Sequence, residues 1–190
     1  HTMKQLKLAV YTLALAGIPR PPLIQGRVFL GDHAEAPRRF AFAARDRIDE
    51  AVQRIRSVHD DRFHYIRTFT TGPTFASLNR YKEKCFPIQP LMRQLHAEGK
   101  LTGPPLALMQ HHGPCEELFD TQSDPHEIHD LSQSAQPEHR EALTRLRAAL
   151  DTWITETVDR GVTPEPLEII APFEKEMHDW FGTPAWANPK

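Results

Sequence analysis

The sequence predicts an α+β fold in which a small antiparallel sheet of about four strands packs against a long amphipathic helix near the C-terminus. Residues 53–69 alternate apolar and polar side chains around a short turn, which is typical of a half-buried hairpin. Apolar residues recur every three or four positions between residues 137 and 158, which is typical of a helix with one buried face. A helical segment is also expected at the N-terminus.

That N-terminal segment allows two interpretations. Residues 4–16 carry apolar side chains at helical spacing, and Gly17 followed by Pro19 would end such a helix. The same residues also resemble a secretory signal peptide, because a basic start leads into a short apolar stretch and Ala14–Ala16. We favour the helix. Several prolines then predict a loop as far as residue 38.

Three strands are expected next. The short apolar run Phe40–Ala44 predicts a buried strand, and the charged cluster Arg45–Arg47 follows it. Gln53–His59 and Arg62–Phe69 form the clearest hairpin in the sequence, with a turn at residues 60–61.

The middle of the chain predicts short elements separated by breaks. Residues 70–87 resemble a loop, and Pro90–Glu98 has the pattern of a helix that Gly99 stops. Residues 104 and 105 are both proline and indicate another break. Glu116–Asp120 is a short candidate strand.

The long helix is predicted from Pro137, a favourable first-turn residue, to about Val158, and Gly161 lies beyond its end. Its apolar stripe consists of Leu143, Leu146, Leu150, Trp153, Ile154 and, at its end, Thr157 or Val158. Residues 162–190 contain five prolines and predict an extended tail that wraps a surface.

Composition excludes some classes of function. The 23 Lys and Arg residues against 25 Asp and Glu give a formal net charge of -2, which removes the electrostatic case for nucleic-acid binding. No apolar run of about 18 residues occurs, so no membrane span is expected. Cys85 and Cys115 could pair or remain free thiols, and the sequence leaves both possibilities open.

The histidines around residue 126 are candidate metal ligands. His126 and His129 have a spacing that fits one face of a helix, and Asp124, Asp130 and the pair at 111–112 could join them. A zinc site needs a defined third and fourth ligand, however, so a solvated turn with scattered histidines is the favoured interpretation. We therefore assign no metal ligand in this chain.

The cluster Arg45, Asp46 and Arg47 is the candidate substrate contact. Arginine binds sulfate or carboxylate through two parallel hydrogen bonds, and loops at strand ends commonly carry ligand-binding groups. The alternative is an internal ion-pair network that fixes the end of the strand. Both interpretations stay open.

Cys85–Gln89 reads Cys-Phe-Pro-Ile-Gln and nearly matches the Cys-x-Pro-x-Arg motif that marks the formylglycine of sulfatases. Glutamine replaces the arginine here, so we interpret this match as a coincidence. The surrounding sequence nevertheless resembles the sulfatase family, including its arylsulfatase and sulfamidase-like members, over nearly the whole chain. The segments that carry the resemblance occur in the family's order: Leu15–Pro19, Gln25–Arg27, Phe42–Glu50, Ile55–Arg67, Glu116–Asp120, Asp124–Glu127 and Leu131.

The resemblance covers only the C-terminal portion of a sulfatase. It implies that residues 1–38 correspond to the end of the catalytic domain, residues 39–161 to the C-terminal subdomain and residues 162–190 to a proline-rich wrapping tail. The family's nucleophile and metal-ligand motifs lie upstream of everything present here. We therefore expect no catalytic residue in this chain, and we expect formylglycine and calcium only in the missing catalytic region.

Two functions follow from this resemblance. The first is that the chain completes the substrate cleft of a sulfuric-ester hydrolase and is inactive alone. The second is that it is a free-standing module that binds sulfated carbohydrate or mediates oligomerisation. An apolar face is expected to dock the catalytic domain or a second copy of the chain. Family membership would imply a periplasmic or secreted protein.

Overall fold

A computed structural model describes residues 16–19, 26–28, 31–32, 34–70, 77–110 and 115–187. The chain divides into two compact units, His1–Arg39 and Phe40–Lys190. In the first unit, the predicted helix lies outside the described residues up to residue 15, and Gly17 has a φ of 69°, the left-handed conformation common after a helix end.

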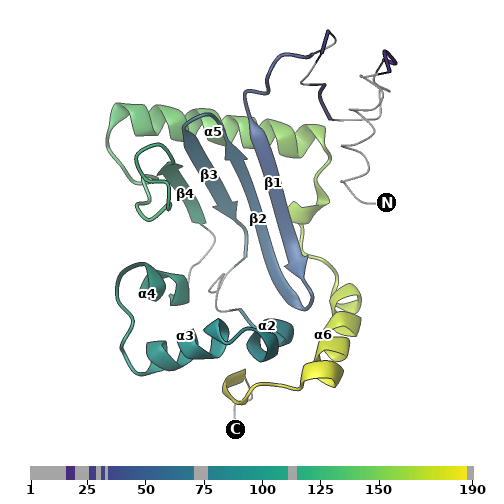
Figure 1. The fold of residues 1–190 in the computed structure, drawn as a ribbon, viewed down its shortest axis with the longest axis vertical. Coiled ribbons are helices and arrows are strands. Elements are labelled where there is room, and N and C mark those ends of the chain that lie inside the picture. The colour runs from purple at the N-terminus through teal and green to yellow at the C-terminus, as the bar shows by residue number, and fades with distance from the viewer. Residues whose placement is uncertain are drawn as a thin grey trace. The chain divides into compact units, whose positions relative to one another are not determined.

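The second unit is built on a four-stranded antiparallel sheet with the strand order β1-β2-β3-β4 (Figure 1). The strands are β1 (Ala41–Ile48), β2 (Ala51–His59), β3 (Phe63–Thr68) and β4 (Cys115–Asp120). Each strand pairs with its neighbour in antiparallel register, so the predicted α+β class and the predicted small sheet are confirmed.

Asp60 fixes the predicted hairpin between β2 and β3. Its side-chain Oδ1 accepts hydrogen bonds from the backbone N–H groups of Arg62, at 3.0 Å, and Phe63, at 2.7 Å. Its own N–H donates to the carbonyl of Phe63 at 3.0 Å. An aspartate side chain that bonds to the backbone two and three residues ahead closes a tight turn without help from glycine.

The first strand is longer than the sequence predicts. β1 continues through Arg45–Arg47 to Ile48, and Asp49, with a φ of 52°, begins a two-residue turn into β2. The expectation that the charged cluster follows the strand is therefore wrong. Edge strands tolerate charged residues, and an aspartate in the left-handed region allows a short hairpin turn.

The main core lies between the sheet and α5 (Pro137–Glu156), as predicted. Leu146 and Leu150 are fully buried against Val58, Tyr65 and Leu118 of three successive strands. The stripe also extends to Trp153, whose ring stacks on Phe42 with centroids 5.3 Å apart. Val158, which the sequence includes in the stripe, is 76% exposed and does not belong to the core.

The described residues between β3 and β4 form three short helices: α2 (Arg80–Cys85), α3 (Ile88–Ala97) and α4 (Gly103–Met109). The interpretation of residues 70–87 as loop is wrong at α2, where the Asn79 side chain accepts from the N–H of Lys82 at 2.8 Å and caps the helix. The break expected at residues 104–105 is also wrong, because both prolines occupy the first turn of α4, where no intrahelical N–H is needed.

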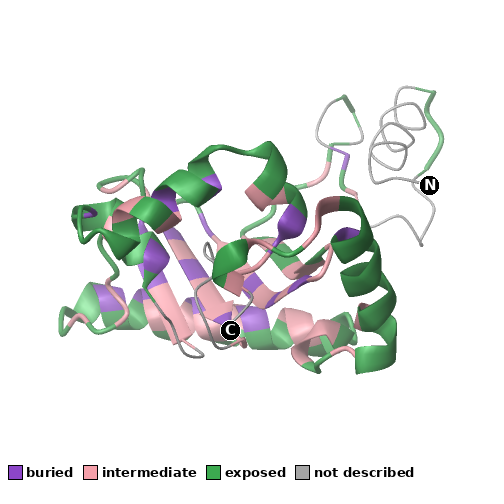
Figure 2. Cartoon of the chain, turned by 90° about the horizontal axis from the view of Figure 1, so that it is seen from below, coloured by how far each residue is buried: buried purple, intermediate pink, exposed green. Residues whose placement is uncertain are grey.

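The expectation of an extended C-terminal tail is wrong as well. Residues 167–181 form the helix α6 (Leu167–Phe181), between the short helical turns η1 (Arg160–Val162) and η2 (Ala185–Ala187). Within α6 Met177 is buried and Ile170 and Phe181 are partly buried, while the other residues of the helix are exposed (Figure 2). No helix in the described part of the chain is long and apolar enough to cross a lipid bilayer.

The sheet face opposite α5 carries no helix among the described residues. Figure 1 looks onto this face, and none of the described helices crosses in front of the strands. Because side chains alternate along a strand, Ser57, Ile66 and Glu117 point to this face, between core residues that point to α5. All three are only partly buried, whereas Thr68 and Phe119, which share this face, are buried, and the loop after β4 reaches it through the contact of Glu127 with His64. We refer to this side of β1–β4 as the uncovered face.

Leu146 gives a test of the core. Replacing it by alanine removes buried methyl groups at a fully enclosed site, so the free energy of unfolding should fall by about 2–5 kcal/mol. Leu108, which is 49% exposed on α4, is the matched control, and Leu108→Ala should change stability by less than about 0.5 kcal/mol. Urea unfolding followed by circular dichroism measures both, and equal effects would contradict this assignment of the core.

Candidate functional site

The candidate cluster on β1 adjoins a buried arginine of β2. Arg56 has no exposed side-chain surface, and its five N–H groups all donate hydrogen bonds. The acceptors are the Asp159 carboxylate, at 2.5 and 2.9 Å, the Asp46 carboxylate, at 2.7 Å, and the carbonyls of Arg45 and Ile55, at 3.0 and 2.8 Å. A guanidinium offers five donors, so this buried group is fully satisfied.

The two partners make Arg56 a structural charge. Hydrogen bonds from its guanidinium are the largest influence on Asp159 and hold the pKa of that carboxyl below its ordinary value. In turn, the hydrogen bond to Asp159 is the leading cause that raises the pKa of Arg56. Both groups therefore stay ionised, and the pair connects β2 with the segment that follows α5.

Gly161 completes this arrangement. A Cβ atom at this position would lie 1.6 Å from Nη2 of Arg56 and 2.2 Å from Oδ1 of Asp46. The Gly161 N–H also donates to Asp159 at 3.0 Å. The glycine is needed because the Arg56 guanidinium packs directly against the backbone of η1.

Arg47 also makes internal contacts. Its Nε donates to Glu165 at 2.9 Å, and its Nη1 donates to the carbonyl of Asp49 at 2.7 Å. The guanidinium carbon lies 3.9 Å from the centre of the Phe173 ring on α6. Arg47 thus holds the C-terminal segment against the tip of the β1–β2 hairpin.

Arg45 differs from its two neighbours. It forms no ion pair with a carboxylate in the described part of the chain, and its buried Nε has no hydrogen-bond partner there. Burial lowers the pKa of this guanidinium. Of the three candidate contacts, Asp46 and Arg47 belong to internal networks, whereas Arg45 keeps an unpaired cation that can accept an anionic ligand.

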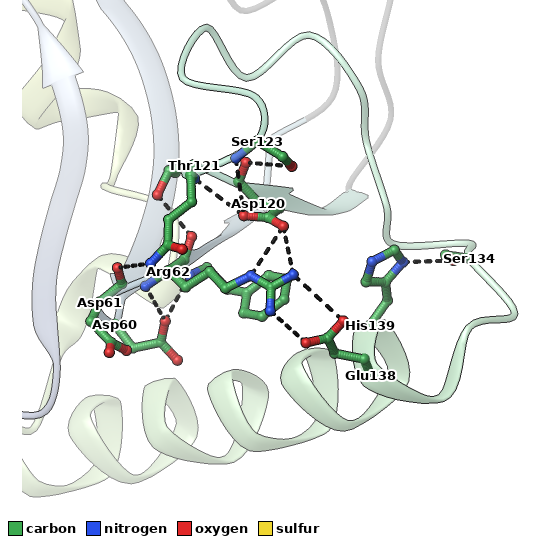
Figure 3. Close-up of polar contacts among 11 residues, drawn as sticks. Asp60, Asp61, Arg62, Asp120, Thr121, Ser123, Ser134, Glu138 and His139 are labelled. Atoms are coloured by element: carbon green, nitrogen blue, oxygen red, sulfur yellow. Dashed lines mark hydrogen bonds and ion pairs between the residues drawn. The ribbon is translucent and has the colours of Figure 1, made fainter.

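A second polar cluster lies at the other end of the sheet, where Figure 3 shows Arg62 between two carboxylates. Its guanidinium donates to Asp120 at 2.8 Å and to Glu138 at 2.5 Å, and Arg145 donates to Asp60 at 2.7 Å. These groups border a cavity of about 300 Å³ lined by Asp60, Asp61, Arg62, Phe63, Gln122, Glu138, Glu141 and Arg145. The acids outnumber the arginines in this lining, so it does not suit an anionic ligand.

The two histidines of the β2–β3 hairpin pack beside each other, with ring centroids 5.6 Å apart for His59 and His64. His64 Nδ1 lies 2.7 Å from Oε1 of Glu127, a residue with a φ of 53°. Both histidines are partly buried rather than fully exposed. The pair of His64 and Glu127 fastens the loop after β4 to the sheet.

The described residues provide no set of ligands that fits calcium or another metal ion, since no three His, Cys, Asp or Glu side chains gather suitably among them. His129 is 77% exposed and lies 3.4 Å from Asp124, whose carboxylate instead accepts two backbone N–H groups. The pair at 111–112 lies outside the described residues. Cys85 and Cys115 are both free thiols.

Sequence patterns missed the central residues of the β1 network. Apolar and polar residues alternate along β2 in the sequence, and this pattern predicts that Arg56 faces solvent. In the structure, however, the alternation of buried and partly buried positions shifts by one residue between Gln53 and Arg56, so Arg56 is buried. The pairing of β1 with β2 also shifts at this point, between Arg45 and Arg47. The sequence offered one signal of this network. An acid, Asp159, and a glycine, Gly161, lie two residues apart just beyond the end of the long helix.

Gly161→Ala tests the β1 network. The added methyl group must displace the guanidinium of Arg56 or the carboxylate of Asp46, so stability should fall by about 1–3 kcal/mol. Thr163→Ala, at an exposed position just beyond η1, is the control and should have little effect. Chemical denaturation of both variants provides the comparison, and a neutral Gly161→Ala would show that Arg56 does not pack on η1.

Asp120 gives a pH prediction. The hydrogen bond from Arg62 is the largest influence and lowers the pKa of Asp120 to about 2. A carboxyl whose pKa is lowered by folding stabilises the protein above its unfolded pKa, near 3.8, and this contribution is lost as the pH falls towards 2. Arg62→Gln should therefore reduce the loss of stability between pH 4 and pH 2, as measured by urea unfolding. An unchanged pH dependence in that variant would contradict the assignment.

Comparisons with known proteins agree with the fold and the sequence motifs. No protein-family model matches the chain. The chain is 37% identical, over 153 residues and 80% of its length, to an ulvan-active sulfatase from Formosa agariphila. The chain spans only 25% of the length of that relative, and the matched quarter is the relative's C-terminal part.

A solved structure gives the same fold. It is described as a complex of a protein with its substrate D-glucosamine-2-N,6-O-disulfate, and it matches 84% of this chain and 25% of its own chain with a TM-score of 0.52 at 15% identity. At this identity the match concerns the fold alone. The sequence relationship to the ulvan-active sulfatase, together with the ordered motifs, places the chain in the sulfatase family as a counterpart of its C-terminal part.

Proposed function

We propose that this chain is the C-terminal region of a sulfuric-ester hydrolase and completes the substrate cleft of a separate catalytic region. The 37% identity to a sulfatase over 80% of the chain carries this proposal. The formylglycine nucleophile and the calcium ion would belong to the catalytic region, which the described residues do not replace. The chain alone would be inactive.

The uncovered face is the proposed docking surface for that catalytic region. A sheet that is covered by a helix on one side usually packs its other side against a further layer when both sides carry apolar residues. Ile55 and Ile66 lie on strand positions that alternate with the core residues, and both are only partly buried. Association of two copies of the chain through the same face is the competing arrangement.

Arg45 is the proposed substrate contact from this chain. Its guanidinium has no carboxylate partner among the described residues, and it lies on the strand that begins this unit. A guanidinium can bind a sulfate or carboxylate group with two parallel hydrogen bonds. In this proposal Asp46 and Arg47 do not touch the substrate but hold the strand that carries Arg45.

The proposed substrate class is a sulfated carbohydrate. The related sulfatase is described as active on ulvan, and the structure with the same fold is described with a disulfated glucosamine as its substrate. An arginine that pairs with no carboxylate among the described residues suits such anionic sugars.

Complementation tests the proposal. The ulvan-active relative is expressed without the quarter that this chain matches, and the chain is added as a separate protein in the presence of calcium. Sulfate release should require both components. Ser57→Arg, on the uncovered face, should abolish the effect, whereas Ala148→Arg, on the exposed side of α5, should not. Full complementation by Ser57→Arg, or sulfate release from the chain alone, would contradict the proposal.

Arg45→Ala tests the substrate contact in the complemented enzyme. Loss of a charge-assisted hydrogen bond should weaken substrate binding by about 1.5–3 kcal/mol and raise KM about tenfold or more, with a smaller change in kcat. Arg45→Lys should recover part of the loss because it restores the charge without the bidentate geometry. Arg140→Ala, on an exposed position of α5, is the control. An unchanged KM for Arg45→Ala would remove Arg45 from the site.

A further inference from the structure

The helices α2 and α6 lie against each other (Figure 1). Exposed aromatic side chains gather where these two helices meet. The ring centroids of Phe86 and Tyr81 are 5.7 Å apart, those of Tyr81 and Phe181 are 5.7 Å apart, and those of Phe181 and Trp180 are 6.2 Å apart. We name these four residues the aromatic surface. Tyr81, Phe86 and Trp180 are 44%, 45% and 66% exposed.

The rings of the aromatic surface support one another. Adjacent rings meet edge to face, at interplanar angles of 67° to 81°, which is a favourable arrangement for aromatic pairs. Contacts at the chain end also fix this region, since Trp186 packs 3.5 Å from the guanidinium of Arg93 and donates to Glu83 at 3.3 Å. Large apolar groups held in place while exposed are typical of a binding surface.

Positive charge borders the aromatic surface. Lys84 follows Tyr81 by three residues on α2, so both lie on the same side of the helix. Lys82 and Lys84 form no ion pair within the described ranges. Of the acids on these two helices, Glu83 pairs with Arg93 and Asp179 pairs with Lys175, whereas Glu176, four residues before Trp180, forms no ion pair within the described ranges, so the positive charge lies on the α2 side of the surface.

We infer that the aromatic surface binds the sugar rings of a sulfated polysaccharide, with Lys82 and Lys84 beside its sulfate groups. A sulfated sugar has apolar C–H faces, which suit exposed aromatic rings, and anionic groups, which suit unpaired lysines. The choice of a sulfated ligand rests on the proposed function. The surface lies on α2 and α6, apart from Arg45, so it would hold a different part of the same polymer and raise its effective concentration.

The unpaired lysines favour an anionic ligand, because sulfate groups complement their charge. Association of two copies of the chain is the competing occupant, and the test below separates the two. An anionic sugar polymer therefore satisfies both the apolar and the charged parts of the surface.

The test uses the full chain and fluorescein-labelled dextran sulfate, with binding followed by fluorescence anisotropy. Dextran sulfate should bind with an affinity that falls as salt is added, and unlabelled dextran should compete at least tenfold more weakly. Trp180→Ala and Tyr81→Ala should each lower the affinity at least fivefold. Lys84→Gln should also lower it and should reduce the dependence on salt.

Two substitutions at exposed positions elsewhere are matched controls. Val158→Ala removes an apolar group that is 76% exposed beyond α5, and Lys100→Gln removes a lysine that is 66% exposed. Neither should change the affinity. Circular dichroism confirms that each variant is folded before it is compared.

Three results would overturn the inference. The first is wild-type affinity for dextran sulfate in both Trp180→Ala and Tyr81→Ala. The second is an equal loss of affinity in the control variants. The third is a concentration-dependent dimer that Trp180→Ala dissociates, which would make a second copy of the chain the occupant. The assay needs no catalytic region. Its failure therefore leaves the complementation experiment unaffected, and a failure of complementation leaves this binding measurement intact.

Discussion

The second unit depends on the buried guanidinium of Arg56. A buried charge is costly unless every polar atom is satisfied, and Arg56 meets this condition with two carboxylates and two carbonyls. Its partners come from β1, from β2 itself and from the segment after α5. One side chain therefore makes the edge of the sheet and the C-terminal segment interdependent, and Gly161 allows the close approach.

This constraint explains the asymmetry of the sheet. α5 covers one side with a continuous apolar core, and the chain after α5 is then fastened to β1 and β2 by Arg56 and Arg47. The C-terminal residues continue as α6 to contact α2 instead of crossing the other side of the sheet. The uncovered face thus remains available, which supports a role in completing a larger enzyme.

Local periodicity was sufficient to predict the sheet, the β2–β3 hairpin and α5. The alternation around residues 60–61 and the stripe through Leu146 and Leu150 each arise from one buried face, and such faces leave a clear pattern in sequence. α6 was missed because its prolines were interpreted as breaks, although Pro166 precedes the helix and Gly182, with a φ of 69°, ends it. A proline inside the helix, Pro172, reinforced that error.

The site was less predictable than the fold. The sequence identified the segment 45–47 but could not separate Arg45 from its neighbours, because that distinction depends on which carboxylates lie nearby in the folded unit. Arg56 was missed for a related reason, since strand alternation assigns its side chain to solvent and the shift in register reverses this. Charge pairing across about 100 residues of sequence leaves no local pattern.

Hydrogen–deuterium exchange tests the central claim most directly, that the uncovered face completes a sulfatase. Exchange is compared for the chain alone and for the chain mixed with the catalytic region of the ulvan-active relative. The account predicts added protection in β1–β4, at the residues bordering the uncovered face, with little change on the outer side of α5. Unchanged exchange in the strands, or protection confined to α5, would contradict it.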